Sequence, residues 1–503
     1  MKQTGLRRRR TRGQRAVLGL SVLSAVALAA SAGTSGGVPA TAAGQGDLGT
    51  QSVWHSDGER WGYDQRVSTG TSLTQISKII GTDWMWTQNY TGKGVGIAMI
   101  DTGVARVPGL TSGNVINGPD LSFESQDPAT RYVDRFGHGT HLAGIMVGKD
   151  SATGFKGMAP DAKLTSIKVA AGDGAVDVVQ VLAAIDWVIQ HKNDDPANPI
   201  RVLNLAYGTD GTQDYRSNPL AFAVEQAWKA GIVVVVAGGN DGTNKANLVN
   251  PAFDPYVISV GSVDDKGSTA IEDDSLSDFS SRGNSNRRVD FSAPGRSVIS
   301  LRAPGSFIDV NYPSARVGTA QFKGSGTSQT SAIVSGAIAG LLQAKPGWTP
   351  DQVKAMARKA TWRMNNQDVA AGTGGLVVAW AVTNTMPSST TQSYSAATGV
   401  GTLESARGNS HVTLDGVKLS GEKNIFGTAF STTTWAKASA ARTAWVGGAW
   451  MGTAWAGEGW STTNGVKSWT GRAWSGRAWS GGAWNGRAWS GASWNGTEWS
   501  TGN

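Results

Sequence analysis

Short apolar strands alternate with helix-like segments through the middle of this 503-residue chain, and that alternation limits its fold more than any other feature. The apolar runs are residues 95–100, 164–169, 200–205, 232–237 and 256–260, and the helix-like segments are residues 176–190, 220–229 and 329–343. Strands that are buried on both faces of a parallel sheet are continuously apolar, as Val233-Val234-Val235-Val236 is. The pattern predicts right-handed βαβ units, and therefore an α/β domain over residues 79–383 with a mainly parallel central sheet flanked by helices.

The first 42 residues have the composition of an export signal. They contain Lys2, Arg7, Arg8, Arg9, Arg10, Arg12 and Arg15 and no acidic residue, followed by an apolar run over 16–30 and small residues at 30–32 and 40–42. The apolar run is shorter than the roughly 20 residues that span a membrane, so we expect a cleaved signal peptide over 1–42 and no remaining membrane anchor. Removing these seven cations from the chain's 45 Lys and Arg leaves 38 against 37 Asp and Glu. The basic balance therefore indicates export and not nucleic-acid binding.

Other parts of the chain stand apart from the α/β domain. Residues 43–78 are polar and weakly patterned, and we expect an N-terminal extension or the remnant of a propeptide. Residues 384–430 predict a Ser/Thr-rich linker followed by a small β element. The chain contains no cysteine, which excludes a disulfide framework, a thiolate zinc site and a cysteine nucleophile.

Residues 431–503 form a Trp/Gly pentapeptide-repeat tail. Tryptophan recurs every five residues from Trp445 to Trp460 and again from Trp469 to Trp499. An odd period sends successive side chains to opposite faces of one strand, whereas turns at the glycines would let the tryptophans stack. Flat aromatic faces suit sugar rings, so one hypothesis is a platform for cell-wall polysaccharide. The alternative is a Gly/Ser-rich extension that is unfolded or stacks only on itself.

Three segments carry residues with chemical potential. Asp101 follows an apolar strand, where reactive groups gather in open parallel sheets. His138 lies between two glycines at the start of a helical stretch, and Ser328 opens another helix, whose positive end favours a developing negative charge. Each residue alone is also typical of an ordinary cap or turn. His141 competes for the role of base, but its apolar neighbours predict a buried, hydrogen-bonded support.

Together these segments resemble the subtilisin-like serine proteases, the subtilases, in which the order along the chain is Asp, His, Ser. Further segments with the family's pattern are residues 90–95, 157–160, 202–208, 279–283 and 291–295. The resemblance covers about 300 of the 503 residues. It implies a subtilisin-like three-layer α/β fold, to which the Gly/Trp-rich extension is added.

The resemblance also implies a set of site residues. Asp101, His138 and Ser328 would be the catalytic triad of a secreted endopeptidase acting on proteins or peptides, with Asn240 and the Ser328 backbone N–H in the oxyanion hole. The substrate-binding positions would be Leu205, Ala206, Tyr207, Gly208, Ala237, Gly238 and Gly239. Catalysis by this mechanism requires no cofactor. The alternative function is a cell-wall or surface-binding protein in which the protease-like domain is a weakly active or inactive scaffold.

The chain departs from the family pattern at several positions. Gln329 and Thr330 follow the serine in place of the usual Met-Ala, and Gly109 stands where many members have a calcium-binding Asp. The loop over 148–154 is also shortened, so a structural calcium remains an expectation without an assigned ligand. Val249 replaces a frequent glycine and would narrow the S1 pocket, which favours an apolar P1 side chain of moderate size.

Overall fold

The computed structural model describes residues 52–54, 60–62, 70–364 and 368–455. The predicted signal peptide and the tryptophan repeats from residue 456 onward lie outside the described residues, as does most of the predicted N-terminal extension.

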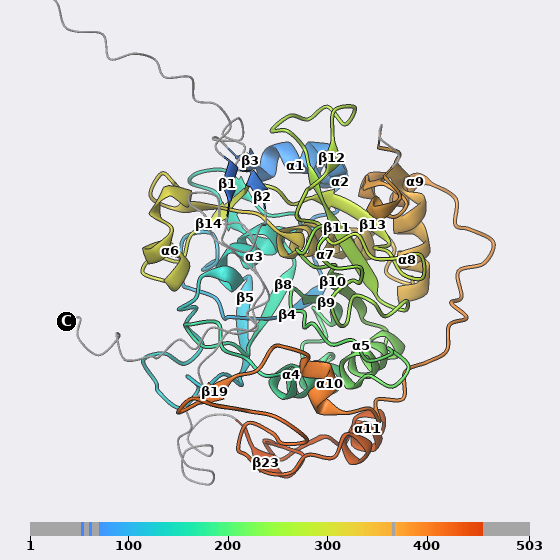
Figure 1. The fold of residues 1–503 in the computed structure, drawn as a ribbon. Helices are drawn as coiled ribbons and strands as arrows, with labels where there is room; N and C mark the ends of the chain where they lie inside the picture. The colour runs from blue at the N-terminus through green and yellow to red at the C-terminus, as the bar shows by residue number, and fades with distance from the viewer. Residues whose placement is uncertain (1–51, 55–59, 63–69, 365–367, 456–503) are drawn as a thin grey trace, which may run out of the picture. The chain divides into compact units, whose positions relative to one another are not determined.

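A 10-stranded sheet runs through the centre of the described residues (Figure 1). From one edge to the other its strands are β17 (Thr361–Trp362), β18 (Gly375–Leu376), β13 (Phe291–Pro294), β11 (Ile258–Asp264), β10 (Val233–Ala237), β9 (Ile200–Leu205), β4 (Gly96–Asp101), β8 (Lys163–Lys168) and β5 (Val115–Asp120), and β12 (Ser275–Leu276) pairs with β11. All pairs from β18 to β5 are parallel, whereas β17 and β12 pair antiparallel with their neighbours. The predicted parallel α/β sheet is confirmed.

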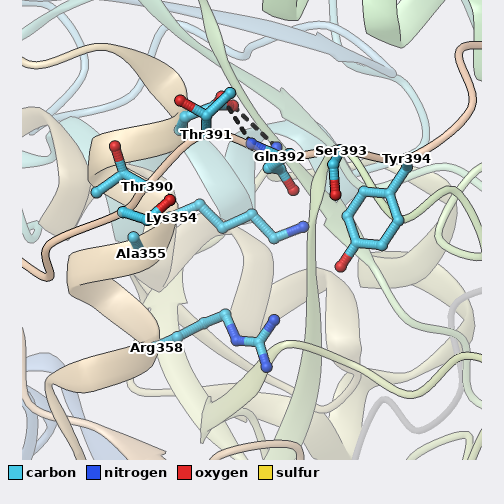
Figure 2. Close-up of a pocket in the computed structure, with 10 residues that line it drawn as sticks. Lys354, Ala355, Arg358, Thr390, Thr391, Gln392, Ser393 and Tyr394 are labelled. Atoms are coloured by element: carbon cyan, nitrogen blue, oxygen red, sulfur yellow. Dashed lines mark hydrogen bonds between the residues drawn. The ribbon is translucent and has the colours of Figure 1, made fainter.

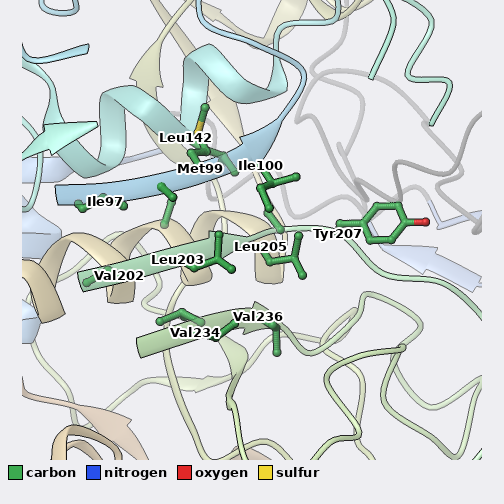
Figure 3. Packing of buried hydrophobic residues seen from close by; sticks show 14 of the residues in the cluster. Ile97, Met99, Ile100, Leu142, Val202, Leu203, Leu205, Tyr207, Val234 and Val236 are labelled. Atoms are coloured by element: carbon green, nitrogen blue, oxygen red, sulfur yellow. The ribbon is translucent and has the colours of Figure 1, made fainter. Parts of the chain in front are cut away.

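The strands in the middle of the sheet are apolar because both of their faces are covered. Val233, Val234, Val235 and Val236 are all completely buried. Figure 3 shows the side chains of Val234 and Val236 beside those of β4 and β9, with Leu142 of a covering helix above. No residue of such a strand faces water, so the sequence has no alternation between polar and apolar positions.

Helices cover both faces of this sheet. Their bounds are α1 (Leu73–Ile80), α2 (Thr82–Thr87), α3 (His138–Val147), α4 (Val178–His191), α5 (Pro219–Lys229), α6 (Phe307–Asn311), α7 (Thr327–Ala344), α8 (Pro350–Lys359), α9 (Val378–Thr383), α10 (Leu403–Arg407) and α11 (Thr432–Ala440). Helices α3 and α7 pack together on one side, and α4 and α5 pack together on the other (Figure 1). The three helices predicted from sequence are α4, α5 and α7, with ends that differ by no more than two residues.

Smaller sheets complete the described part. One contains β15 (Arg316–Val317), β16 (Gln321–Gly324), β14 (Val298–Leu301) and β3 (Thr71–Ser72), and the others are β1 (Ser52–Trp54) with β2 (Arg60–Gly62), β6 (Lys149–Asp150) with β7 (Phe155–Lys156), β19 (Thr413–Leu414) with β20 (Val417–Lys418), and β21 (Trp445–Val446) with β22 (Ala449–Trp450) and β23 (Thr453–Ala454). The β19–β20 hairpin lies where the sequence predicts a small β element.

The folded unit begins before residue 79, the start that the sequence analysis gives for the α/β domain. Strand β3 pairs parallel with β14, and helix α1 buries Leu73, Ile76 and Ile80 in the same hydrophobic core as the central strands. A helix of eight residues offers only a few periodic positions, and polar residues precede it in the sequence. Residues 71–78 are therefore part of the core and not of a separate extension.

The folded unit also continues beyond residue 383. Helix α11 packs against α5, helix α10 and strand β21 pack against α4, and Trp435, Trp450 and Trp455 are almost completely buried. This part of the predicted linker and tail adds a layer over α4 and α5 instead of standing apart (Figure 1). Its aromatic residues lie inside because α4 and α5 present apolar surface there.

The first tryptophan repeats fold as a small antiparallel meander. Trp445 pairs with Trp450 and Trp450 pairs with Thr453, so one period of five residues supplies a short strand and a turn. The turns use glycines with positive φ, among them Gly448 at 80° and Gly452 at 78°. Turns at the glycines bring these tryptophans together, as the sequence predicts for such turns, and the resulting structure is an antiparallel meander.

A buried carboxylate in α4, Asp186, holds the tryptophan-containing part of this layer. The indole N–H groups of Trp435 and Trp450 each donate to Asp186 Oδ2 at 2.8 Å, and the Ser439 hydroxyl donates to Oδ1. Trp445 Nε1 donates to the Ala183 carbonyl oxygen at 2.8 Å. Asp186 is 2% exposed, and burial raises its pKa to about 6 despite these three hydrogen bonds.

We expect Asp186 to make the stability of the fold depend on pH. Its pKa is higher in the folded chain than the ordinary value of 3.8, so its stabilising contribution is fully present below pH 4 and is lost as pH rises through 6. In Asp186→Asn the amide does not titrate. The free energy of unfolding of the wild type, relative to this variant, should fall by about 1–3 kcal/mol between pH 4 and pH 7.

Denaturant unfolding at a series of pH values measures this difference. Asp194→Asn is the matched control, because Asp194 is an exposed carboxylate shortly after the same helix. A difference between wild type and Asp186→Asn that stays constant with pH would contradict the prediction.

Candidate active site

Asp101 and His138 meet where a central strand ends and a helix begins. Asp101 is the last residue of β4 and His138 is the first residue of α3. The imidazole Nδ1 lies 2.9 Å from Asp101 Oδ1 and 3.0 Å from Oδ2, and both side chains are at most 1% exposed. A carboxylate can only accept, so Nδ1 carries the proton and the opposite ring nitrogen, Nε2, is left as an acceptor.

The carboxylate of Asp134 fixes the start of the histidine helix. Its Oδ1 accepts from the backbone N–H groups of Phe136 at 3.2 Å and Gly137 at 2.6 Å. Its Oδ2 accepts from the N–H of Thr140 at 2.8 Å and from the hydroxyl of the same residue. These donors lie around the N-terminus of α3, where backbone N–H groups have no partner inside the helix. Burial nevertheless raises the pKa of Asp134, because the side chain is cut off from water.

Thr102 connects Asp134 to both candidate residues. Its hydroxyl donates to Asp134 Oδ1 at 2.8 Å and accepts from the backbone N–H of Gly139 at 2.8 Å. Its own backbone N–H donates to Asp101 Oδ1 at 2.8 Å. Neither Asp134 nor Thr102 was predicted from the sequence to have a role in the site. An acidic residue four positions before a Gly-flanked histidine is the signal that could have found the first of them.

Gly139 allows the strand end and the helix start to touch. A β-carbon at this position would lie 2.1 Å from the Gly103 carbonyl oxygen and 3.0 Å from Asp101 Oδ1. Only a residue without a side chain leaves room for that approach, so the glycine after His138 is a condition of the Asp101–His138 contact.

Ser328 and Asn240 are joined through the residue between them in space, Thr327. Ser328 is the second residue of α7, so its backbone N–H belongs to the first turn, which has no intrahelical acceptors. Asn240 Oδ1 accepts from the backbone N–H of Thr327 at 2.8 Å and from its hydroxyl at 2.9 Å. These two hydrogen bonds fix the orientation of the Asn240 amide group.

His141 supports the site from behind, as its apolar surroundings predict. It is completely buried, and Nε2 lies 3.2 Å from the Val298 carbonyl oxygen and 3.1 Å from that of Phe322. Both partners are acceptors, so Nε2 carries a proton, and burial lowers the pKa of His141 to about 3. The neutral ring ties helix α3 to β14 and to β16, the strand that precedes Ser328.

The predicted substrate-binding segments end on neighbouring strands. Leu205 closes β9 and pairs with Val236, next to Ala237 at the end of β10. A β-carbon on Gly208 would lie 2.4 Å from Val249, and one on Gly239 would lie 2.8 Å from the same side chain. Val249 therefore fills the space between the two segments, as expected for a residue that narrows a pocket.

Tyr207 differs from the other predicted substrate-binding positions because its side chain points into the protein. It is 1% exposed, and burial raises the pKa of its phenol well above the ordinary value, with Asp177 and Arg407 close enough to influence it. Its ring belongs to the packing between α4 and α10.

A cavity of about 330 Å³ lies between helix α8 and residues 389–394 (Figure 2). The side chains around it already have partners: Gln392 Nε2 donates to Asp351 Oδ1 at 2.9 Å, and Lys354 Nζ lies 3.3 Å from Asp290. Neither Asp101, His138 nor Ser328 lines this cavity, so it is not part of the candidate site.

The described residues show neither a cluster placed to bind a metal ion nor a helix that could span a membrane. Within them, no group of three or more His, Asp or Glu side chains is placed to hold a metal ion, and we assign no calcium ligand. Among the helices of the same residues, none is both long enough and apolar enough to cross a membrane.

We expect Gly139→Ala to destabilise the fold although alanine normally favours a helix over glycine by about 1 kcal/mol. The new β-carbon would force β4 and α3 apart, and we expect the free energy of unfolding to fall by about 1–3 kcal/mol in denaturant unfolding. Gly347→Ala is the matched control, because a β-carbon there meets no atom within 4 Å. Equal stability of the two variants would contradict the proposed close contact.

Comparison with known proteins places this geometry in a family. Residues 92–401 match the model described as the subtilase family. The chain is 38% identical over 309 residues to serine protease AprX of Bacillus subtilis (strain 168), which is 60% of this chain and 68% of that protein. It is 32% identical over 275 residues to minor extracellular protease Epr of the same organism, with 54% and 36% covered. It is 31% identical over 295 residues to subtilisin E, with 58% and 65% covered. The chain, with its buried Asp–His pair at the edge of a parallel sheet, belongs to the subtilase family of serine proteases.

Proposed function

We propose that the chain is a secreted serine endopeptidase that hydrolyses peptide bonds through an acyl-enzyme formed on Ser328. The observation that carries the proposal is the contact of 2.9 Å between His138 Nδ1 and Asp101 Oδ1. This contact leaves Nε2 as a proton acceptor on a ring whose orientation is held by Asp101, and Ser328 begins the helix that packs against α3.

In the first half of the reaction the Ser328 oxygen attacks the carbonyl carbon of the substrate while His138 Nε2 takes the hydroxyl proton. The tetrahedral intermediate then collapses as Nε2 gives this proton to the leaving nitrogen and the C–N bond breaks. In the second half a water molecule attacks the ester carbon, again with Nε2 as the base. The ester C–O bond then breaks as Nε2 returns the proton to the Ser328 oxygen, and the acid product leaves. Asp101 stabilises the imidazolium that forms in each half, and no cofactor is consumed.

Negative charge on the substrate oxygen requires donors that are already in place. Asn240 Nδ2 and the backbone N–H of Ser328 are the proposed donors. The hydrogen bonds from Thr327 to Asn240 Oδ1 support this assignment, because they prevent the amide from rotating. The N-terminus of α7 adds the positive end of a helix dipole next to Ser328.

The substrate would lie along the strand ends at Leu205–Gly208 and 237–239. We propose that an extended peptide pairs with backbone groups of this region, which would allow many sequences to be accepted. Val249 lies between the two segments and would narrow the S1 pocket. We therefore propose a preference for apolar P1 side chains of moderate size.

Export rests on residues 1–42. Their cationic start, apolar run and small residues are the sequence of a signal peptide. One relative is named an extracellular protease and another is named major intracellular serine protease, so the relatives alone do not distinguish the two locations. We propose that the mature enzyme acts outside the cell.

The structure does not favour polysaccharide binding by the described repeats. Trp445, Trp450 and Trp455 are at most 8% exposed, so they present no flat face to a sugar. The repeats from Trp460 onward lie outside the described residues. We therefore propose no second function.

Labelling by an active-site phosphonylating reagent tests the nucleophile. We expect the wild type to take up one equivalent on Ser328 and Ser328→Ala to take up none, with peptide hydrolysis abolished. Ser331→Ala is the control, since its hydroxyl donates to the Ser328 carbonyl one turn further along α7. Mass spectrometry of the labelled protein identifies the modified residue. Label that survives in Ser328→Ala would refute the assignment.

Asn240→Ala should lower kcat by about 10²- to 10³-fold with little change in KM, a range known for this type of donor in subtilisin, a relative of this chain. The reason is that the amide meets the substrate oxygen mainly after charge has developed on it. Asn244→Ala, an exposed asparagine nearby, serves as the control and should keep wild-type kinetics. Steady-state kinetics with a chromogenic peptide decide the matter; a change confined to KM would argue against an oxyanion role.

A further inference from the structure

Helix α10 lies beyond residue 401, the last residue that matches the family model. It contacts Thr209 and Asn250, which adjoin the walls of the proposed S1 pocket. The carbonyl oxygen of Ala406 accepts from the Thr209 hydroxyl at 2.6 Å and from Asn250 Nδ2 at 3.2 Å. One backbone oxygen of the C-terminal segment thus holds two side chains that come from different loops.

Thr209 and Asn250 directly follow the two residues that form the pocket wall. Thr209 comes after Gly208, and Asn250 comes after Val249. Thr209 and Asn250 also form an isolated β-bridge, with backbone N–H···O distances of 3.0 Å in both directions. Any shift of Thr209 relative to Asn250 would therefore change the distance between Gly208 and Val249.

The contact with α10 is close enough to be rigid. A β-carbon on Gly211 would lie 2.7 Å from the Ser405 carbonyl oxygen, and one on Gly408 would lie 2.6 Å from the backbone of Asp210. Two stretches of backbone therefore touch without side chains between them. Such an interface can transmit a displacement because it has no flexible groups to absorb it.

A buried ion pair fixes α10 in this place. The Arg407 side chain is completely buried, and its Nε donates to Asp177 Oδ2 at 2.6 Å. The same guanidinium donates to the carbonyl oxygens of Gly421 and Lys423 at 2.6 Å and 2.5 Å. Asp177 is the N-cap of α4, so the pair connects the C-terminal segment to a helix of the central fold.

We propose that residues 403–423 are a positioning element that sets the width of the S1 pocket. They act through the Ala406 carbonyl oxygen, which holds Thr209 and Asn250. The proposal rests on the proposed peptidase function and extends it to specificity. Thr209 and Arg407 are positioning residues in this scheme, because they act on Gly208 and Val249 and not on the substrate itself. When the contact of the Ala406 carbonyl oxygen with Thr209 and Asn250, here called the brace, is weakened, Gly208 and Val249 can move apart. A larger P1 side chain can then enter the S1 pocket.

Thr209→Val in the full-length protein is the direct test, since it removes the hydroxyl with little change in volume. Peptides that differ only at P1, with Ala, Leu or Phe, are assayed well below the melting temperature, where both proteins are folded. We expect the ratio of kcat/KM for Phe to that for Ala to rise by roughly threefold or more, mainly through KM. Unchanged ratios in Thr209→Val would overturn the proposal, whatever its melting temperature.

Ser439→Ala separates this effect from a general loss of stability. It removes a hydrogen bond to Asp186 in the same C-terminal layer but touches neither Thr209 nor Asn250. We expect a lower melting temperature with wild-type P1 ratios. A P1 shift of equal size in Ser439→Ala would also contradict the proposal. Arg407→Ala, if it folds, should shift the ratios in the same direction as Thr209→Val.

Calorimetry measures the binding of the same peptides with a reduced, non-cleavable amide at the scissile bond. This measurement separates a failure of the proposed peptidase function from a failure of the proposed role of residues 403–423. If the wild type takes no phosphonylating label, the proposed function has failed. The affinities of the Ala, Leu and Phe peptides, compared between wild type and Thr209→Val, still test the role of residues 403–423. Identical affinity ratios in the two proteins would refute that role on their own.

Discussion

The site depends on the close approach of the end of β4 to the start of α3. Asp101 and His138 are 37 residues apart in the chain, yet their side chains meet at 2.9 Å because Gly139 has no side chain to hold the backbones apart. Asp134 and Thr102 then accept hydrogen bonds from the backbone N–H groups of Thr140 and Gly139 at this junction, and the Thr102 hydroxyl donates to Asp134. A buried imidazole is thereby held in one tautomer and one orientation by the folded protein. It therefore does not have to reorient when a substrate binds.

The same principle explains the other half of the site. The amide of Asn240 is oriented by Thr327, which also accepts a hydrogen bond from the backbone N–H of Gly239. Asn240, which we propose as an oxyanion donor, and the strand end at 237–239 are therefore parts of one hydrogen-bonded unit. His141 adds a second connection between the helix of His138 and the strand before Ser328. It does so as a neutral group, because burial lowers its pKa.

The C-terminal layer shows how an addition to a family fold can become part of its core. Asp186 gathers three donors from residues 435–450, and Arg407 reaches Asp177 over 230 positions of sequence. Both acidic residues belong to the α4 region, on the side of the sheet opposite α3 and α7. Removal of this layer would expose the apolar surface of α4 and α5 and leave Asp177 and Asp186 without their partners, which is costly.

The sequence by itself determined the parallel α/β sheet, the order Asp101, His138, Ser328 and the segment of Asn240, because these features are written in short local patterns: continuous apolar runs, glycine-flanked residues and helix starts. Only the tertiary structure decided the roles of Asp134, Thr102 and Arg407, and the burial of the first repeat tryptophans. Their partners lie far away in the chain, and a single buried charge has no periodic pattern that would mark it. The boundaries at residues 79 and 383 moved for the same reason: whether a short helix or a Trp-Gly segment belongs to a core depends on the apolar surface that receives it.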